Sequence, residues 1–419
     1  ISKWLYKHWE SGHIIPGFET LINRGYGALI EDTKSKLLCA EETQKADLQA
    51  MLICEQAAAE YIIRYADFAA SLAEESQDPI YKSHLLEMED SLRHIAYKPA
   101  RTFFDAVQLI WLSHEMLYAE NFPASLSFGR LDQYLYPFYE KDIKEGTLSR
   151  EEAEDIIDAL WIKFGITLHG YQNITIGGIS EQGEYASNEL TIMMLQASRK
   201  TLFDQPLLCL RYDKSMPDEV WEESVELLKT GIGLPAIFID DFCIDTKIRM
   251  GQSRKDAVDY GLVGCVEMSS PGKEYAKTEA LRVNLGKILE ILFFEGKSNC
   301  VDSGGIIGNS STPSIALSNS NIKDYTFPLF SDYRFEQISS FEELIGWYKE
   351  ELKGQLTFSM TAINRLDSAL PKCYPTPFLS TLIDGCIEKG KDVTAGGAIY
   401  NNSGINLCGL PNVVDSLSA

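Results

Sequence analysis

The chain has 419 residues, of which 45% are hydrophobic, enough to bury one large core or two smaller ones. Its formal net charge of −23 is expected to repel nucleic acid and anionic membrane surfaces. The sequence has no basic segment followed by an apolar signal region and no apolar run of transmembrane length, so we expect neither a secretory leader nor a membrane span within it.

Nine cysteines are scattered between Cys39 and Cys408, and none forms a Cys-x-x-Cys pair. This spacing argues against zinc ribbons and iron–sulfur ligation. An odd number of cysteines in a long chain also fits a reducing cytoplasm better than a disulfide framework. We therefore predict a cytoplasmic protein without a bound metal.

The first part of the chain is predicted to be helical. Residues 1–97 include a long, Ala-rich amphipathic stretch at 41–85, and Pro79 is typical of a helix start. Residues 102–120 are predicted to form a buried helix that contains His-Glu-x-x-Tyr at 114–118. Because tyrosine replaces the second histidine of the zincin motif, we expect no metal there.

A loop follows at residues 121–123, and then Ser125 and Ser127 alternate with Leu126 and Phe128. Alternation of this kind can direct both hydroxyls toward one space. Serine in a loop more often serves as a turn or cap residue, so a structural role stays open beside a pocket role.

Between residues 151 and 239 the predicted helices and strands alternate, which indicates parallel strands with helices outside. Periodicity does not distinguish an open sheet from a barrel. Further along we predict helices at 278–294, 341–366 and 379–388, a long loop at 298–321 and a proline-rich turn at 371–377. For the alternating region the predicted helices are 151–164, 187–201 and 217–230, and the predicted strands are 169–178, 206–212 and 234–239.

The most informative segment is Gly-Cys-Val-Glu at residues 264–267. If it is extended, Cys265 and Glu267 face one space and Val266 turns into packing. A neighbouring carboxylate keeps a thiol protonated, which suits transfer of hydrogen atoms by sulfur and of protons by the carboxylate. The structural alternative is an inert buried cysteine beside an ion-paired acid.

Residues 385–391 have the Gly-x4-Gly-Lys spacing of a phosphate-binding loop, but Asp392 replaces the required Ser or Thr and would repel phosphates. The stretch fits a helix that ends at Gly390. No Gly-x-Gly-x-x-Gly fingerprint is present. We therefore expect no bound nucleotide.

The cysteine segment resembles the active-site loop of the glycyl radical enzymes, relatives of pyruvate formate-lyase. Four other motifs match the family in its order: Gly-Arg-Leu-Asp-Gln at 129–133, Asn-Ile-Thr-Ile-Gly-Gly at 173–178, Gly-Ile-Gly-Leu-Pro-Ala at 231–236, and the stretches at 392–401 and 412–417. The resemblance implies a ten-stranded α/β barrel over residues 1–419, surrounded by helices, with the cysteine loop in its centre.

The resemblance also implies the chemistry. A protein glycyl radical, installed by a separate radical-SAM activating enzyme, takes the hydrogen atom of Cys265, and the resulting thiyl abstracts hydrogen from a small polar substrate. Glu267 then assists elimination of a neighbouring group, so the enzyme is a lyase or dehydratase. We further expect a homodimer in the cytoplasm of an anaerobic bacterium.

Six residues are implied as substrate contacts: Thr278, Glu279, Ser125, Ser127, His13 and Tyr400. Thr278 matches the choline branch of the family, whereas Glu279 falls where the glycerol-dehydratase branch has an aspartate, so the substrate stays open. A helix N-terminus, with Thr as cap and Glu in the first turn, is the structural alternative at 278–279. For His13 and Tyr400 the structural alternatives are a loop histidine that bonds a local carbonyl and an ordinary buried tyrosine.

The family's glycyl radical loop lies downstream of the segment that corresponds to 412–417, so we expect a fragment, truncated at both ends, that lacks the C-terminal radical domain. Three alternatives remain. A pyruvate formate-lyase proper would need two adjacent cysteines, whereas Cys265 follows a glycine and precedes a valine. An arylacetate decarboxylase shares the Gly-Cys-Val-Glu loop, and a non-catalytic barrel or the subunit of a split enzyme is the third possibility.

Overall fold

The computed structural model describes residues 13–121, 125–167, 169–295, 297–298, 307–308, 325–326, 329–330 and 334–419. The chain divides into two compact units. Unit 1 comprises Ile1–Gly12, Lys277–Tyr374 and Asn402–Ala419, and unit 2 comprises His13–Ala276 and Pro375–Asn401. The predicted organisation of residues 1–419 as a single barrel domain stays a prediction.

Unit 2 begins with the predicted helical region, and its helix ends follow from local chemistry. Pro79 occupies the first turn of α4, and Asp78 Oδ1 accepts hydrogen bonds from the backbone N–H groups of Ile80 (2.8 Å) and Tyr81 (3.3 Å), which confirms the predicted helix start. The helices are α2 (Phe18–Leu38), α3 (Glu42–Glu75), α4 (Pro79–Ile95), α5 (Phe103–Asn121), α6 (Leu131–Tyr134), α7 (Tyr136–Glu145), α8 (Arg150–Ile166), α9 (Glu189–Thr201), α10 (Asp218–Leu228), α11 (Asp240–Arg249), α12 (Arg254–Val258), α15 (Pro377–Thr381), α16 (Cys386–Lys389) and the 3₁₀ turn η2 (Val393–Ala395).

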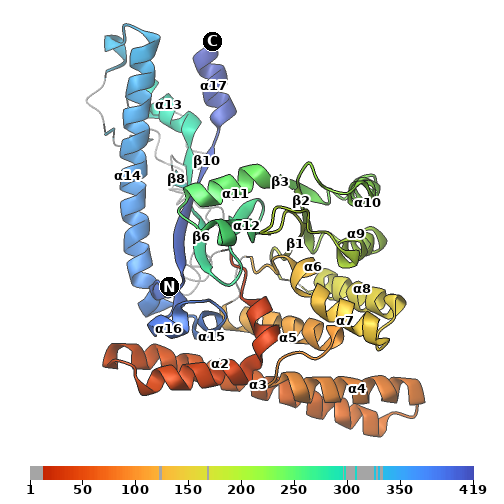
Figure 1. Ribbon diagram of the computed structural model, residues 1–419. Helices are drawn as coiled ribbons and strands as arrows, with labels where there is room; N and C mark the ends of the chain where they lie inside the picture. Colours follow the sequence, from red (N-terminus) through yellow and green to blue (C-terminus); the bar gives the residue numbers. More distant parts are fainter. Residues whose placement is uncertain are drawn as a thin grey trace. The chain divides into compact units, whose positions relative to one another are not determined.

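The strands of unit 2 confirm the predicted parallel arrangement. Strands β1 (Asn173–Gly177), β2 (Leu207–Tyr212) and β3 (Ala236–Ile239) form a parallel sheet in that order, with Asn173 opposite Leu207 and Cys209 opposite Ala236. Helices α9 and α10 make the crossovers (Figure 1). Isolated parallel bridges, Ile14 to Leu126 and Gly129 to Ile174, continue the arrangement on the β1 side.

A hairpin of β4 (Gly261–Val263) and β5 (Glu267–Ser269) leaves residues 264–266 as its tip. Val263 pairs with Glu267 and Gly261 with Ser269. This hairpin corresponds to the cysteine segment singled out in the sequence.

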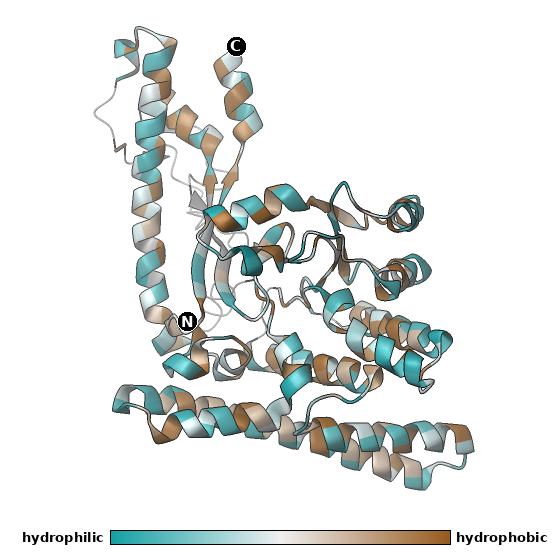
Figure 2. Cartoon of the chain, viewed as in Figure 1, coloured by the Kyte–Doolittle hydropathy of each residue, from teal (hydrophilic) through white to brown (hydrophobic). Residues whose placement is uncertain are grey.

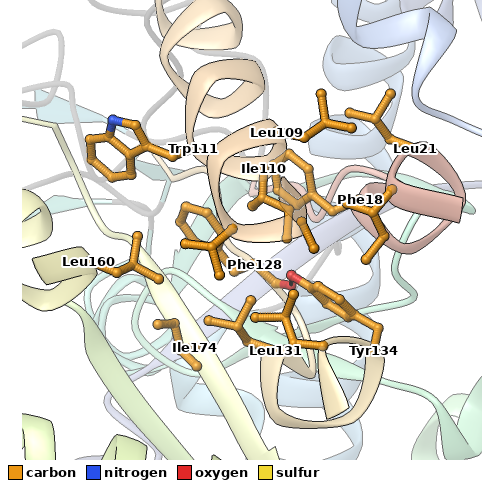
Figure 3. Close-up of a cluster of buried hydrophobic side chains, with 14 of the residues drawn as sticks. Phe18, Leu21, Leu109, Ile110, Trp111, Phe128, Leu131, Tyr134, Leu160 and Ile174 are labelled. Carbon is orange, nitrogen blue, oxygen red and sulfur yellow. Dashed lines mark hydrogen bonds between the residues drawn. The ribbon is translucent and has the colours of Figure 1, made fainter. Parts of the chain in front are cut away.

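The core of unit 2 is a continuous cluster of buried apolar side chains between the helices and β1. Figure 3 shows Leu131, within the 129–133 motif, and Phe128, which directly precedes the motif. Both lie beside Ile174 of β1 and residues of α2, α5 and α8. The rings of Phe18 and Phe128 stack with centroids 5.4 Å apart. The motif segments thus lie in the core and take their positions from it.

In unit 1, strand order is β10–β6–β8, and β7 pairs antiparallel with β9. Helices α13 and α14 contribute most of a second apolar cluster. The elements are β6 (Glu274–Asn284), α13 (Leu285–Phe293), β7 (Lys297–Ser298), β8 (Ile307–Gly308), β9 (Tyr325–Thr326), η1 (Phe335–Gln337), α14 (Phe341–Cys373), β10 (Tyr400–Cys408) and α17 (Leu410–Ser418), with the first residues of β6 and β10 in unit 2.

The prediction of one helix over 278–294 is wrong for its first half, because residues up to Asn284 belong to β6. Arg282 and Val283 of this segment pair with β8, which is remote in sequence, and β10 is the neighbour of β6 on its other side. The helix begins only at Leu285, where Asn284 Oδ1 accepts from Lys287 N–H at 3.0 Å. The alternative of a helix N-terminus at Thr278 and Glu279 is therefore also wrong.

Two boundaries in the C-terminal part of the chain differ from prediction. Pro371, expected in a turn, lies inside α14, which continues to Cys373. The helix expected at 379–388 is interrupted at Gly385, whose φ of +94° is left-handed, so α15 and α16 are separate. Gly390 caps α16 with φ +58°, as predicted. Most of the loop expected at 298–321 lies outside the described residues.

Hydrophilic and hydrophobic colours alternate along α3, α4 and α14, as expected of helices with one buried face (Figure 2). Among the described residues, no helix combines the length and the apolar character needed to cross a membrane.

Candidate active site

The tip of the β4–β5 hairpin presents Cys265 and Val266 at the surface, and Val266 is 65% exposed. The expectation that Val266 turns into packing is wrong. Residues 264–266 make a turn, with Gly264 at φ +59°, so the period-two alternation of an extended strand does not hold there. Cys265 therefore lies at the turn itself.

Glu267 folds back toward the tip. Its Oε2 accepts hydrogen bonds from the backbone N–H groups of Cys265 and Val266, both at 3.0 Å. The carboxylate is therefore fixed against the backbone that carries the thiol. The structure brings the two predicted catalytic residues together, as the sequence indicated.

His13 lies beside Gly264. A Cβ placed on Gly264 would lie 2.5 Å from His13 Nε2 and 2.7 Å from Glu267 Oε2. The imidazole and the carboxylate thus flank the same small volume, and only glycine fits between them. His13 is buried, with 7% exposure, beside the tip.

Ser125 and Ser127 are fully buried beneath the tip. Ser125 Oγ accepts from Gly264 N–H at 2.8 Å, and Ser127 Oγ accepts from Asn173 N–H at 3.2 Å. Asn173 Nδ2 donates to the Gly264 carbonyl at 2.9 Å. Both backbone polar groups of Gly264 are therefore anchored by side chains from neighbouring segments.

The strand that leads into the tip is held by a buried charged network. Leu262 N–H donates to Thr175 Oγ1 at 2.8 Å, and Arg211 Nη1 donates to the Tyr260 carbonyl at 3.1 Å. Asp240 pairs with Arg211 at 2.6 and 3.1 Å and accepts from Tyr260 Oη at 2.8 Å. The residues of this network come from four different segments, which fixes β4 relative to β1 and β2.

A second buried pair lies under β5. Lys247 forms an ion pair with Glu274, and neither side chain is more than 1% exposed. Glu274 Oε2 also accepts from Ser270 N–H at 2.9 Å and from Gln252 Nε2 at 3.0 Å. Burial lowers the pKa of Lys247, although Glu274 beside it acts in the opposite direction. The strand that leaves the tip is thus anchored as the incoming strand is.

The buried Cys209 also lies near the anchor, since Asn173 Nδ2 is 3.6 Å from its sulfur. Burial raises the pKa of Cys209 to about 12, and the Asn173 hydrogen bond offsets this only in part. Cys209 is therefore a protonated, structural thiol, in contrast to the exposed Cys265.

The remaining predicted contacts are placed as follows. Tyr400 Oη donates to Asp256 Oδ2 at 2.7 Å and accepts from Ser253 N–H at 3.3 Å, so the structure brings Tyr400 to the start of α12. Thr278 and Glu279 lie in the backbone of β6, and their side chains are outside the described residues. Their role as substrate contacts stays a prediction.

Asn173, Thr175 and Arg211 had no assigned role in the sequence analysis, although Asn173 and Thr175 stand in a quoted motif. The available signal was the position of that motif on a strand preceding the cysteine segment. Nothing in the sequence indicated that their side chains contact the hairpin.

A family model described as pyruvate formate lyase-like matches residues 1–419. The chain is 29% identical to (2S)-3-sulfopropanediol dehydratase of Klebsiella oxytoca, over 99% of this chain and 50% of the relative. In a solved structure of 1,2-propanediol dehydration in Roseburia inulinivorans, the matching chain is 30% identical with a TM-score of 0.86, over 99% of this chain and 49% of that one. A glycyl radical enzyme from Archaeoglobus fulgidus gives 30% identity and a TM-score of 0.82, over 99% and 54%.

The chain therefore belongs to the pyruvate formate lyase-like family, and the relatives it matches are glycyl radical enzymes. The chain spans about half the length of the curated relatives it matches. The likeness confirms the predicted fold class, an α/β barrel of the pyruvate formate-lyase type. Closure by ten strands stays a prediction.

Proposed function

We propose that this chain carries the thiyl site of a glycyl radical lyase or dehydratase, with Cys265 as the hydrogen-abstracting residue and Glu267 as the acid–base residue. The observation that carries the proposal is the hairpin tip: an exposed cysteine, a carboxylate that accepts from the cysteine's own backbone N–H, and an anchored glycine directly before the cysteine. Positioning of this kind lowers the cost of reaching a reactive geometry.

In this family a protein glycyl radical, installed by a radical-SAM activating enzyme, supplies the unpaired electron. The Cys265 S–H bond then breaks as its hydrogen atom passes to the glycyl radical, and the sulfur, now a thiyl, takes a hydrogen atom from a substrate carbon and re-forms S–H. Glu267 takes the proton of the hydroxyl on the carbon that lost hydrogen and passes a proton to the hydroxyl on the adjacent carbon, which leaves as water. Return of the hydrogen atom from sulfur to the product radical restores the thiyl.

The substrate is a small polar molecule with a leaving group next to the carbon that loses hydrogen. Dehydration is favoured over other eliminations because two similar proteins are named for dehydration of a sulfopropanediol and of 1,2-propanediol. His13, Ser125 and Ser127 flank or anchor the tip, and Thr278, Glu279 and Tyr400 complete the candidate contacts. We also infer a homodimer in the cytoplasm of an anaerobe.

The test uses the native protein that contains this chain, prepared anaerobically with its activating enzyme and assayed with small vicinal diols. We expect Cys265→Ser to retain the electron paramagnetic resonance signal of the glycyl radical while losing turnover. Glu267→Gln should lower turnover by about 10²–10⁴-fold. Cys39→Ser, at an exposed position in unit 2, is the matched control and should behave as wild type.

Turnover of Cys265→Ser at the wild-type rate would contradict the proposal. Release of carbon dioxide from arylacetates without any elimination would instead establish the decarboxylase alternative. An activated protein that carries the radical and turns over neither class would favour the non-catalytic reading.

A further inference from the structure

A group of metal-ligating side chains lies on α5 and on the segment before β1. His114, Glu115 and His169 each offer one ligand atom, and these atoms lie within 4.8 Å of one another. The motif at 114–118 lacks the second histidine of a zincin, and the fold supplies another histidine 54 residues beyond Glu115. The expectation of no metal at this motif rests on residues 114–118 alone, and His169 lies outside them.

Two of the three side chains are fixed by neighbouring rings. The His169 ring stacks on Tyr118 with centroids 3.8 Å apart and planes 6° apart, and the His114 ring lies edge-on to Tyr118 at 4.9 Å. His169 Nε2 is 2.8 Å from Glu115 Oε1. Little side-chain freedom is left to lose when a ligand binds.

His114 is fully buried, and its Nε2 lies 3.1 Å from Gln172 Oε1. With the Gln172 amide as placed, this oxygen can only accept, so Nε2 carries the hydrogen and Nδ1 carries the lone pair. Nδ1 is buried, and none of the described residues gives it a hydrogen-bond partner. An unsatisfied buried polar atom destabilises the folded protein, and metal binding would remove that cost. A ligating histidine with its other nitrogen on an oxygen acceptor is also the usual outer arrangement of metal sites.

We propose that His114, Glu115 and His169 bind a divalent transition-metal ion of the zinc class, with a fourth position open to solvent. Two imidazole nitrogens and one carboxylate oxygen are a donor set that zinc accepts. Bonds of about 2.1 Å at tetrahedral angles place two ligand atoms about 3.4 Å apart, so atoms at the 4.8 Å limit approach one another by about 1.4 Å on binding. Glu115, with 30% side-chain exposure, has the freedom to move and leaves a path for the ion.

The bound ion would cross-link α5 to the segment that precedes β1. Asn173, the first residue of β1, anchors Gly264 of the hairpin. Metal binding would then stabilise the folded protein by mass action, independently of catalysis. This inference does not depend on the proposed lyase function.

The test is titration of chelator-treated protein with ZnCl₂ by calorimetry and with CoCl₂ by visible absorption. We expect one equivalent of each ion to bind, and cobalt to show d–d bands without thiolate charge transfer, because the ligands are nitrogen and oxygen. His169→Gln and Glu115→Gln should each weaken binding by at least about tenfold. His84→Gln, at an exposed position on α4, is the matched control and should bind as wild type.

Zinc should also raise the melting temperature of the wild type and of His84→Gln but not of His169→Gln, each compared with its own melting temperature without metal. Three results would overturn the proposal: no stoichiometric binding with zinc in excess, unchanged affinity in both ligand variants, or a thiolate charge-transfer band that assigns the metal to cysteines.

Discussion

Two carboxylates of unit 2, Asp240 and Glu55, are both fully buried but meet different surroundings. Asp240 is paired with the guanidinium of Arg211 and also accepts from Tyr260 Oη and from Ile179 N–H. Within the described part of the chain Glu55 has no such cation: its Oε1 accepts from Thr33 Oγ1 at 2.9 Å, and its Oε2 is buried without a partner there. Burial raises the pKa of Glu55 to about 7.

The difference indicates what each region does. Beneath the hairpin, buried charge is compensated and fixes the strand that carries Cys265. In the layer of α2 and α3, an uncompensated carboxyl makes stability depend on its protonation. Mutations at Asp240 should therefore lower the free energy of unfolding at every pH, whereas mutations at Glu55 should change how the free energy of unfolding depends on pH.

The largest effect is expected for Asp240→Ala. This change leaves Arg211 as an uncompensated buried charge and removes the acceptor of Tyr260 Oη, so the free energy of unfolding should fall by about 3–5 kcal/mol. The measurement is urea denaturation. Asp241→Ala, at the exposed neighbouring position of α11, should change it by no more than about 0.5 kcal/mol.

The double variant Arg211→Met with Asp240→Leu sharpens this prediction. Replacing both partners removes the buried charge, so it should be less damaging than Asp240→Ala alone. Equal losses for Asp240→Ala and Asp241→Ala would show that the network does not hold the fold.

The second prediction concerns pH. The pKa of Glu55 is about 7 in the folded protein and 4.5 when exposed, so the folded state binds the proton more tightly. The resulting stability is fully present below pH 4.5 and is lost as pH rises through 7. The loss amounts to about 3 kcal/mol across that range.

Denaturation midpoints between pH 5 and pH 8 test this expectation. Glu55→Gln should remove most of the slope, because a neutral amide has no proton to lose. Glu60→Gln, exposed on the same helix, should keep the slope. A slope unchanged by Glu55→Gln would assign the pH dependence to other groups.

The third prediction moves from the base of the hairpin to its tip. In Gly264→Ala the new Cβ would meet His13 and Glu267 Oε2, at a position with φ +59°. We expect a loss of about 1–3 kcal/mol in the free energy of unfolding together with loss of turnover in the activated native enzyme.

Gly231→Ala separates backbone strain from crowding. Gly231 has φ +81°, but a Cβ there would have no atom of the described residues within 4 Å. This variant should lose stability to a similar degree through strain and keep its turnover. Loss of turnover in both variants would mean that strain, not displacement of His13 and Glu267, explains the effect.

The sequence predicted elements well where the pattern is local. Helix α5 and strand β2 match the expected ranges closely, since apolar periodicity and flanking breakers mark them. The segment at 278–284 was predicted wrongly because its state depends on pairing with β8, more than 20 residues away along the chain. Local propensity does not contain that information.

The same limit applies to the site. Cys265 and Glu267 could be picked out because they are two residues apart, and their carboxylate–backbone contact is local. The anchors could not: Asn173 and Thr175 lie 91 and 87 residues from the hairpin atoms they bind, and Ser125 lies 139 residues from Gly264. The sequence named Ser125 as a substrate contact, whereas the structure shows it bound to the hairpin backbone.

The smallest effect is expected for Ser125→Ala. Gly264 N–H loses its acceptor in a buried place, which should cost about 1 kcal/mol. Amide hydrogen exchange of the peptide that covers the hairpin should then be about fivefold faster, by the same free energy.

Ser127→Ala is the matched control, because Ser127 Oγ binds Asn173 and not Gly264. Exchange that rises equally in both variants would show that the two serines act as one packed unit. Exchange that rises in neither would show that the tip is held by Asn173 and Glu267 alone.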